Sequence, residues 1–304
     1  DRILWLVDEV LEWAQTAGTP EPWVTISTGS WASPFWLLNS HAVWRGGPDL
    51  GRQGVGSPRQ QWITFRDAMV YGTVVKRSSL FPLSSLSLGG FVWSAVEEPG
   101  AYLSSFDIEE FKSEARSYFL SGVALQELLV QPALLTSAHW DILADAINVS
   151  RSFSSILPDA HWAGGDPAQG EAYAYAAYGC SPCRGVMTWR NPTSKPQVVA
   201  LNLRTVLALP QAWPGGLVGG RWSVTPVWPP DPQSHKVGQD TTSNHTDQGQ
   251  EAIAAAGPSA LAQPKLRLQS NNQSADGVAL DDELLLSLDP FEVWAATALP
   301  LMPG

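Results

Sequence analysis

Basic residues are scarce in this chain and are nowhere clustered. Its 304 residues include 18 Lys and Arg against 29 Asp and Glu, which gives a net charge of −11. Because a nucleic-acid-binding protein needs a basic surface, this balance excludes nucleic acid as a partner. No apolar run approaches the roughly 20 residues that cross a bilayer, so the sequence also predicts no contact with a membrane through a spanning helix.

Cysteine is almost lacking too. The two cysteines, Cys180 and Cys183, lie only three positions apart and cannot build a disulfide framework. Their spacing matches a redox motif, but a thioredoxin-type pair opens a helix after a strand, whereas this pair falls in a predicted hairpin loop. The sequence therefore favours a turn with two incidental thiols. By contrast, tryptophan is abundant, with 15 residues in the chain.

The chain opens with DRILWLVDEVLEW, in which apolar residues recur at helical spacing from the start. This opening has no initiator Met, no basic segment and no cleavage signal. A helix of this kind needs a partner on its N-terminal side. We therefore expect the sequence to begin inside a domain, with part of any active site upstream of residue 1.

Strands and helices alternate over the first half of the chain, in units of about thirty to forty residues, as in a parallel α/β sheet. β-branched and apolar runs predict short strands at 23–29, 41–44 and 80–90. Helix-start signals and periodicity predict helices at 58–75, 107–119 and 136–150, whereas 123–130 fits either a strand or a helix end.

After residue 166 the pattern changes to strands without intervening helices, separated by Gly, Pro and Asn. This is typical of an antiparallel β-sandwich. We therefore expect two domains, 1–165 and 166–304. Within the second, residues 231–276 are rich in Gln, Ser, Asn, Ala and Gly and contain no aromatic residue, which predicts a disordered insertion.

Two predicted strand ends are followed by loops dense in Trp, Ser, Arg and Asp, between residues 27 and 51. In an α/β barrel such loops carry the active site. Trp31, Trp36 and Trp44 could stack on a sugar ring, Arg45 could hold hydroxyl groups, and Asp49 offers a carboxylate. The alternative is that these tryptophans fill space between loops and that Asp49 ends a glycine-rich turn.

Several strings in this region resemble barrel glycoside hydrolases related to α-galactosidases (melibiase-like). They are TGSWASPFWLLNSHAVWRGGPDLG, SPRQQWITFRD and FPLSSLSLGG, followed by SYFLSGVALQELLV, LTSAHWDILADA, LPDAHWAGGDP and GVMTWRNPTSKPQ. Together they extend the resemblance over about residues 20–210. Arg45 and Asp49 keep the spacing of the Arg and Asp in the Arg-x-Ser-x-Asp pattern of the superfamily's acid/base segment, with Gly47 at the position of its Ser.

The resemblance implies a fold and a reaction. The fold would be the second half of a (β/α)8 TIM-type barrel followed by a C-terminal β-sandwich. The reaction would be retaining hydrolysis of glycosidic bonds, which uses two carboxylates roughly 5–5.5 Å apart and no cofactor. Asp49 would be the general acid/base and the tryptophans with Arg45 would line the carbohydrate site. The nucleophile would lie on a strand upstream of residue 1, so the chain alone is expected to be inactive.

Other residues keep two interpretations. Glu127 either faces the sugar site, as a further substrate-binding residue, or is exposed at a helix end. Asp67 is expected to be a solvated or helix-pairing residue. His41, His139 and His161 show no ligand spacing, so no metal site is predicted.

Two alternative functions remain at this stage. The chain could be a non-catalytic carbohydrate-binding remnant, or a scaffold whose sandwich and acidic insertion mediate protein contacts. The sequence leaves its oligomeric state and its compartment open.

Overall fold

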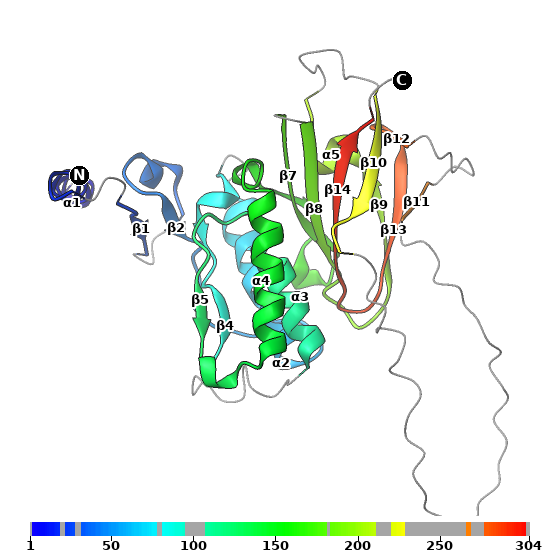
Figure 1. The fold of residues 1–304 in the computed structure, drawn as a ribbon, viewed down its shortest axis with the longest axis horizontal. Helices are drawn as coiled ribbons and strands as arrows, with labels where there is room; N and C mark the ends of the chain where they lie inside the picture. The colour runs from blue at the N-terminus through cyan, green and yellow to red at the C-terminus, as the bar shows by residue number, and fades with distance from the viewer. Residues whose placement is uncertain are drawn as a thin grey trace, which may run out of the picture.

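The structure is a computed structural model, which describes residues 2–18, 22–27, 32–77, 81–94, 107–180, 183–210, 220–228, 266–268 and 277–301. The helices formed by residues 58–70, 108–119 and 137–152 lie between short parallel strands on one side and the antiparallel sheets on the other (Figure 1). The helices are α1 (Arg2–Thr16), α2 (Pro58–Val70), α3 (Ile108–Phe119), α4 (Ser137–Ser152) and α5 (Leu203–Val206). None of these helices has both the length and the hydropathy needed to cross a membrane.

The parallel strands are shorter than the sequence predicts. The first sheet has the order β1–β2–β3, and a separate parallel pair joins β4 to β5. Their bounds are β1 (Thr25–Ile26), β2 (Ala42–Trp44), β3 (Leu86–Ser87), β4 (Phe91–Trp93) and β5 (Leu128–Val130). The segment 123–130 thus forms a strand at its end, and the strand predicted at 80–90 is confirmed only in part.

A pair of glycines separates β3 from β4. Gly89 and Gly90 have φ angles of +90° and +78°, a region that favours glycine because it lacks a Cβ atom. The chain therefore pairs with β2 before this turn and with β5 after it.

The predicted helix starts are confirmed. Ser57 accepts a hydrogen bond from the amide of Gln60 (3.2 Å), and Pro58 takes the first helical position of α2. Asp107 caps α3 by accepting from the amide of Glu109 (2.9 Å). The first turn of α4 is closed by the amide of Thr136, which donates to His139 (3.2 Å). These caps fix the helices that pack beside the parallel strands.

Two antiparallel sheets form the second half of the structure, as the alternating segments predict. The larger has the order β12–β10–β14–β8–β7–β6 and the smaller the order β11–β13–β9. Their bounds are β6 (His161–Gly164), β7 (Tyr173–Cys180), β8 (Cys183–Arg190), β9 (Gln197–Asn202), β10 (Arg221–Pro226), β11 (Leu266–Leu268), β12 (Val278–Ala279), β13 (Glu283–Leu288) and β14 (Val293–Pro300). An apolar cluster with residues from β7, β8, β10 and β14 of one sheet and β9 and β13 of the other joins the two sheets.

Two details refine the expected domain division. Strand β6 precedes residue 166, yet it pairs with β7 in the larger sheet. Strand β11 lies inside the segment 231–276 and pairs with β13, so the prediction of disorder is wrong for these three residues. The rest of that segment lies outside the described residues.

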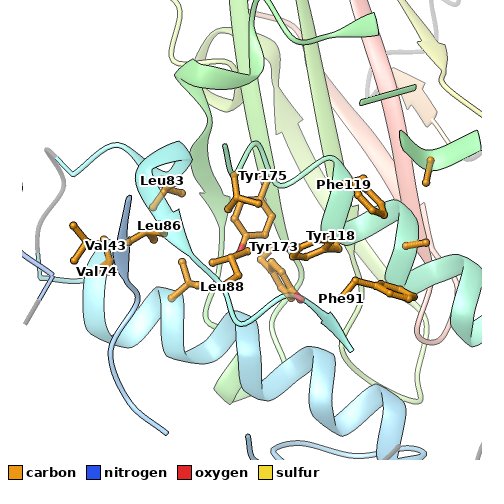
Figure 2. Packing of buried hydrophobic residues seen from close by; sticks show 14 of the residues in the cluster. Val43, Val74, Leu83, Leu86, Leu88, Phe91, Tyr118, Phe119, Tyr173 and Tyr175 are labelled. Carbon is orange, nitrogen blue, oxygen red and sulfur yellow. The ribbon is translucent and has the colours of Figure 1, made fainter. Parts of the chain in front are cut away.

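An apolar cluster, here called the shared core, connects the first half of the structure to the second. It combines residues of β2, β3, β4, α3 and α4 with Tyr173 and Tyr175, which both come from β7 (Figure 2). Side chains of this size each contribute roughly 1.5–3 kcal/mol when they are buried. The parallel strands and the larger sheet are therefore held together by the shared core.

The cysteine pair differs from the expectation. Cys180 and Cys183 face each other across the β7–β8 hairpin and form a disulfide. The prediction of a hairpin position is confirmed, whereas the prediction of two free thiols is wrong. Register explains this, because directly opposed residues of an antiparallel pair bring their Cβ atoms within disulfide range.

Candidate functional site

The loop that follows β2, here called the strand-end loop (45–49), is organised by a buried arginine. Arg45 has no exposed surface, and its guanidinium donates only to backbone carbonyls. The acceptors are the carbonyl oxygens of Leu88 (3.2 Å), Gly46 (2.8 Å), Pro48 (3.1 Å) and Asp49 (3.1 Å). One side chain thus fixes the path of the loop along almost its whole length.

Arg45 is therefore engaged inside the loop, and the binding of sugar hydroxyl groups by its side chain stays a prediction. Its guanidinium carbon lies 4.5 Å from the ring centroid of Trp44 and 5.7 Å from that of Phe65. Burial, assisted by the neighbouring charge of Arg66, lowers the pKa of Arg45 to about 10. The guanidinium of Arg45 therefore remains cationic at neutral pH and continues to donate hydrogen bonds to the loop carbonyls.

Two further contacts hold the strand-end loop. The indole of Trp44 donates to the carbonyl of Gly47 (3.2 Å). In the helical turn Tyr71–Val75, which follows α2, the hydroxyl of Thr73 lies 2.5 Å from the carbonyl oxygen of Arg45. Gly47 has a φ of +75°, and a Cβ atom there would lie 2.9 Å from the sulfur of Met69, so the turn requires glycine.

Asp49 ends this loop with its side chain exposed to solvent. Its backbone carbonyl is bound by Arg45, so the carboxylate projects from a fixed backbone position. This is the arrangement that a general acid or base needs, since such a group must be held at a defined place and still reach the reacting atoms.

The predicted tryptophans have different surroundings. Trp44 is half-buried and contributes to the loop, as described above. Trp36 lies in the short helix η1 (Pro34–Leu38), where it is half-buried against the shared core. Its neighbours Phe35 and Leu38 are 76% and 77% exposed, so this helix presents an apolar surface to solvent. Trp31 lies outside the described residues.

Glu127 immediately precedes β5 and is half-buried. Its carboxylate accepts a hydrogen bond from the hydroxyl of Ser87 in β3 (3.0 Å). Its backbone amide donates to the hydroxyl of Tyr118 (2.9 Å), whose pKa is raised by burial. Glu127 is therefore tied to the strands and is not an exposed residue of a helix end.

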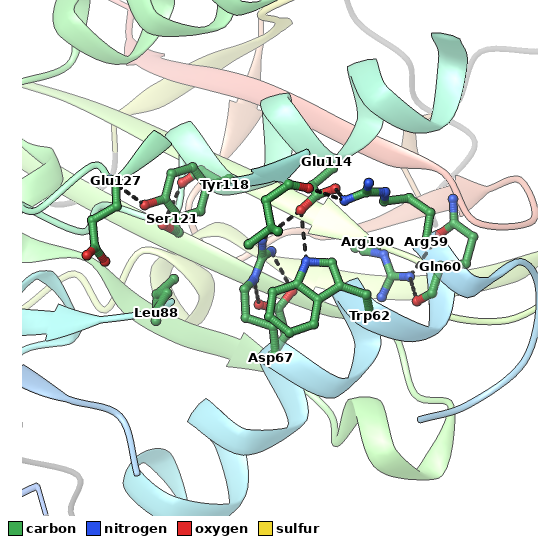
Figure 3. A network of polar contacts seen from close by, with 12 residues as sticks. Arg59, Gln60, Trp62, Asp67, Leu88, Glu114, Tyr118, Ser121, Glu127 and Arg190 are labelled. Atoms are coloured by element: carbon green, nitrogen blue, oxygen red, sulfur yellow. Dashed lines mark hydrogen bonds and ion pairs between the residues drawn. The ribbon is translucent and has the colours of Figure 1, made fainter. Parts of the chain in front are cut away.

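Most of the charged side chains that are buried in the described residues lie elsewhere, between α2, α3 and the larger sheet (Figure 3). Asp67, which the sequence predicts to be a solvated or helix-pairing residue, has no exposed surface. Its carboxylate accepts from Arg66 (3.0 and 3.3 Å), from Tyr173 (2.5 Å) and from Tyr175 (3.2 Å). The prediction is wrong because the face of α2 that carries Asp67 is covered by β7.

Glu114 of α3 occupies the centre of a second set of contacts. Its two carboxylate oxygens accept from the guanidinium of Arg59 (2.6 Å) and from the indole of Trp62 (3.0 Å). Arg66 lies 3.9 Å from the same carboxylate, which links this set to Asp67. All these side chains are buried, so each charge depends on its partners.

Arg190 connects β8 to α2. Its guanidinium donates to the backbone and side-chain oxygens of Gln60, to Thr64 and to Tyr173, at 3.0–3.1 Å. We call the whole group the buried polar joint. It consists of Arg59, Gln60, Trp62, Thr64, Arg66, Asp67, Glu114, Tyr173, Tyr175 and Arg190.

Sequence reasoning missed the buried polar joint because polar letters on an amphipathic helix usually mark its solvent face. One signal was present. Tyr173 and Tyr175 stand two positions apart on one strand, so their hydroxyls share a face of the sheet and need partners when that face is covered. Burial raises the pKa of both tyrosines, which keeps them protonated as donors to Asp67.

No group of three or more His, Cys, Asp or Glu side chains arranged to hold a metal occurs in the part of the chain that the structure describes.

No family model matches the chain, and no curated protein matches it. Among solved structures, it is similar to a candidate α-galactosidase from Bacteroides fragilis NCTC 9343, with 12% identity and a TM-score of 0.41 over 90% of this chain and 46% of that one. It is also similar to α-galactosidase I from Mortierella vinacea, with 12% identity and a TM-score of 0.43 over 88% of this chain and 55% of that one. The chain thus spans about half the length of these two structures.

Proposed function

We propose that the chain is part of a carbohydrate-active protein of the glycoside hydrolase type. In this proposal residues 1–165 form the second half of a (β/α)8 barrel and residues 166–304 form a C-terminal β-sandwich. Asp49 acts as the general acid/base of a retaining reaction on galactoside-like substrates. The proposal unites the sequence resemblance with the position of this carboxylate.

The observation that carries the proposal is the construction of the strand-end loop. A fully buried guanidinium binds four backbone carbonyls and so orients a loop that ends in an exposed carboxylate. Burying a guanidinium is costly unless its N–H groups are hydrogen-bonded. A turn that merely ended in an aspartate would not need a buried arginine to hold its backbone.

The chemistry assigned to Asp49 has two stages. As an acid it protonates the leaving glycosidic oxygen, and as a base it then activates the water that releases the sugar. A second carboxylate, roughly 5–5.5 Å from Asp49, attacks the anomeric carbon. We assign this nucleophile to a strand N-terminal to those described. The half-buried rings of Trp36 and Trp44 supply apolar surface for the sugar face.

The leaving group of the substrate gives the sharpest test. In a protein that contains this chain and hydrolyses α-galactosides, Asp49→Asn should lower kcat/KM, which reports the step that expels the leaving group, about 10²- to 10⁴-fold for alkyl galactosides. Aryl galactosides with acidic phenols need little protonation, so their kcat/KM should fall much less. Asp141→Asn is a matched control, since Asp141 is an exposed aspartate on α4. Equal losses for both classes of substrate would contradict the acid/base role.

A non-catalytic, sugar-binding role would give a different result. Calorimetry with this chain would then detect galactoside binding that Asp49→Asn leaves nearly intact, and no form of the protein would hydrolyse the sugar. Complete lack of sugar affinity would favour the third alternative, a scaffold for protein contacts.

A further inference from the structure

The disulfide between Cys180 and Cys183 lies at the end of the β7–β8 hairpin. Cys180 is exposed and Cys183 is half-buried. These are the only two cysteines in the chain. The bond therefore joins a sulfur that solvent can reach to one that is partly covered.

The hairpin does not depend on this bond for its pairing. Strands β7 and β8 continue in register from Gly179 and Arg184 down to Tyr173 and Arg190, and β8 also pairs with β14. A disulfide stabilises mainly by restricting the unfolded chain, and the effect grows with the length of the closed loop. Because only three sequence positions separate the cysteines, the bond restricts the unfolded chain little. A structural purpose does not account for it.

The residue after the pair is anchored independently. Arg184 donates to the backbone carbonyl of Ser152 (2.7 Å) and to the hydroxyl of Ser155 (3.2 Å), and its guanidinium lies 5.2 Å from the ring centroid of Phe153. These contacts fasten β8 to the end of α4 whether or not the disulfide is present.

We propose that Cys180 and Cys183 form a reversible thiol-exchange site, whose reaction partner is a thiol of low molecular weight or a protein dithiol. The thiolate of the partner attacks the exposed sulfur of Cys180, forms a mixed disulfide with it and releases Cys183 as a thiolate. A second partner thiolate then attacks the partner's sulfur in the mixed disulfide and releases Cys180. Two partner thiols are oxidised to one disulfide, and the protein disulfide is reduced to two thiols.

Titration of the native chain with reduced and oxidised glutathione tests the proposal, with alkylation and mass measurement to count free thiols. Because the chain has two cysteines, every thiol counted belongs to this pair. We expect full and reversible conversion between zero and two thiols without denaturant, with unchanged circular dichroism and a loss in Tm of only a few degrees. The proposal is overturned if millimolar dithiothreitol reduces the bond only after urea unfolds the chain, if oxidised glutathione fails to restore it, or if reduction unfolds the protein.

The single-cysteine variants identify the attacked sulfur. In Cys183→Ser, the remaining Cys180 should react with oxidised glutathione several-fold faster than Cys183 does in Cys180→Ser, because Cys180 is the more exposed. Equal rates, or a faster reaction at Cys183, would overturn the assignment of Cys180. Neither variant touches the strand-end loop, so sugar binding serves as a control for the fold.

Discussion

The buried polar joint and the strand-end loop both contain carboxylates and guanidinium groups, but the two regions differ in which of these groups they bury. In the joint, carboxylates and guanidinium groups are buried together and bind one another between two helices and a sheet. In the loop, one guanidinium is buried so that one carboxylate, that of Asp49, can remain exposed. A charged residue is therefore a candidate for catalysis or ligand binding only when the groups that contact it leave its charged atoms accessible.

The two regions should also differ in how they respond to substitution. Removing one member of a buried ion pair leaves the other charge without compensation in a medium of low polarity, which is strongly destabilising. Removing an exposed carboxylate costs the fold little. The comparison therefore makes predictions that run from the joint to the loop.

Alkaline pH should have the largest effect. Burial raises the pKa of Tyr118, Tyr173 and Tyr175 above the ordinary value. Above about pH 10 the unfolded chain loses these protons while the folded chain keeps them. The contribution of these three tyrosines to the free energy of unfolding is complete below that pH. Above it, the free energy of unfolding should therefore fall by up to about 4 kcal/mol per pH unit.

Phenolate absorbance measured together with circular dichroism would check this prediction. Three of the six tyrosines should ionise only as the chain unfolds. Ionisation of all six near pH 10 in a folded chain would mean that the joint is open to solvent.

Substitution of Asp67 should have the next largest effect. Asp67→Asn keeps the size of the side chain but removes the charge that Arg66 and two tyrosine hydroxyls contact. We expect the free energy of unfolding, measured with urea, to fall by roughly 3–5 kcal/mol. Asp281→Asn is the control, because Asp281 pairs with Arg204 at the surface and its loss should change little. Similar losses in both variants would remove the distinction between buried and exposed pairs.

Substitution of Arg45 should affect both stability and function. Arg45→Met fills part of the same space but leaves the loop carbonyls without their donor, which should cost roughly 2–3 kcal/mol. Galactoside affinity should fall as well, because the loop loses its fixed path. A variant that is destabilised yet binds sugar unchanged would show that Arg45 serves only the fold.

Substitution of Asp49 should have the smallest effect on stability. Because its side chain is exposed, Asp49→Asn should change the free energy of unfolding by no more than about 0.5 kcal/mol. Urea denaturation beside the Asp141→Asn control would check this. A loss comparable to that of Asp67→Asn would place Asp49 among the structural residues.

Much of the architecture follows from local patterns in the sequence. Capping residues such as Ser57 and Asp107 determine where helices begin, and alternating apolar residues give the antiparallel strands. Parallel strands as short as β1 or β3 are harder to delimit, because their length depends on which neighbour the backbone meets.

The candidate site could be predicted only where its residues are close together in the sequence. The turn at Gly46 and Gly47 places Asp49 at a strand end, and this can be read from the sequence. The burial of Arg45 and Asp67 cannot, because it depends on elements far away in the sequence, including the carbonyl of Leu88 for Arg45 and tyrosines more than a hundred residues later for Asp67. A charged residue in the sequence indicates that its side chain needs a hydrogen-bonding or oppositely charged partner if it is buried, but it does not show where that partner lies.

The most direct test of the account is to follow two tryptophan indoles by NMR during titration with galactose. Trp44 belongs to the strand-end loop, whereas the indole of Trp62 donates to Glu114 inside the buried polar joint. Trp44→Phe and Trp62→Phe would assign the two signals. The account predicts a saturable shift of the Trp44 signal and none for Trp62. A Trp44 signal that does not move, or a shift confined to Trp62, would contradict a sugar site at the strand-end loop.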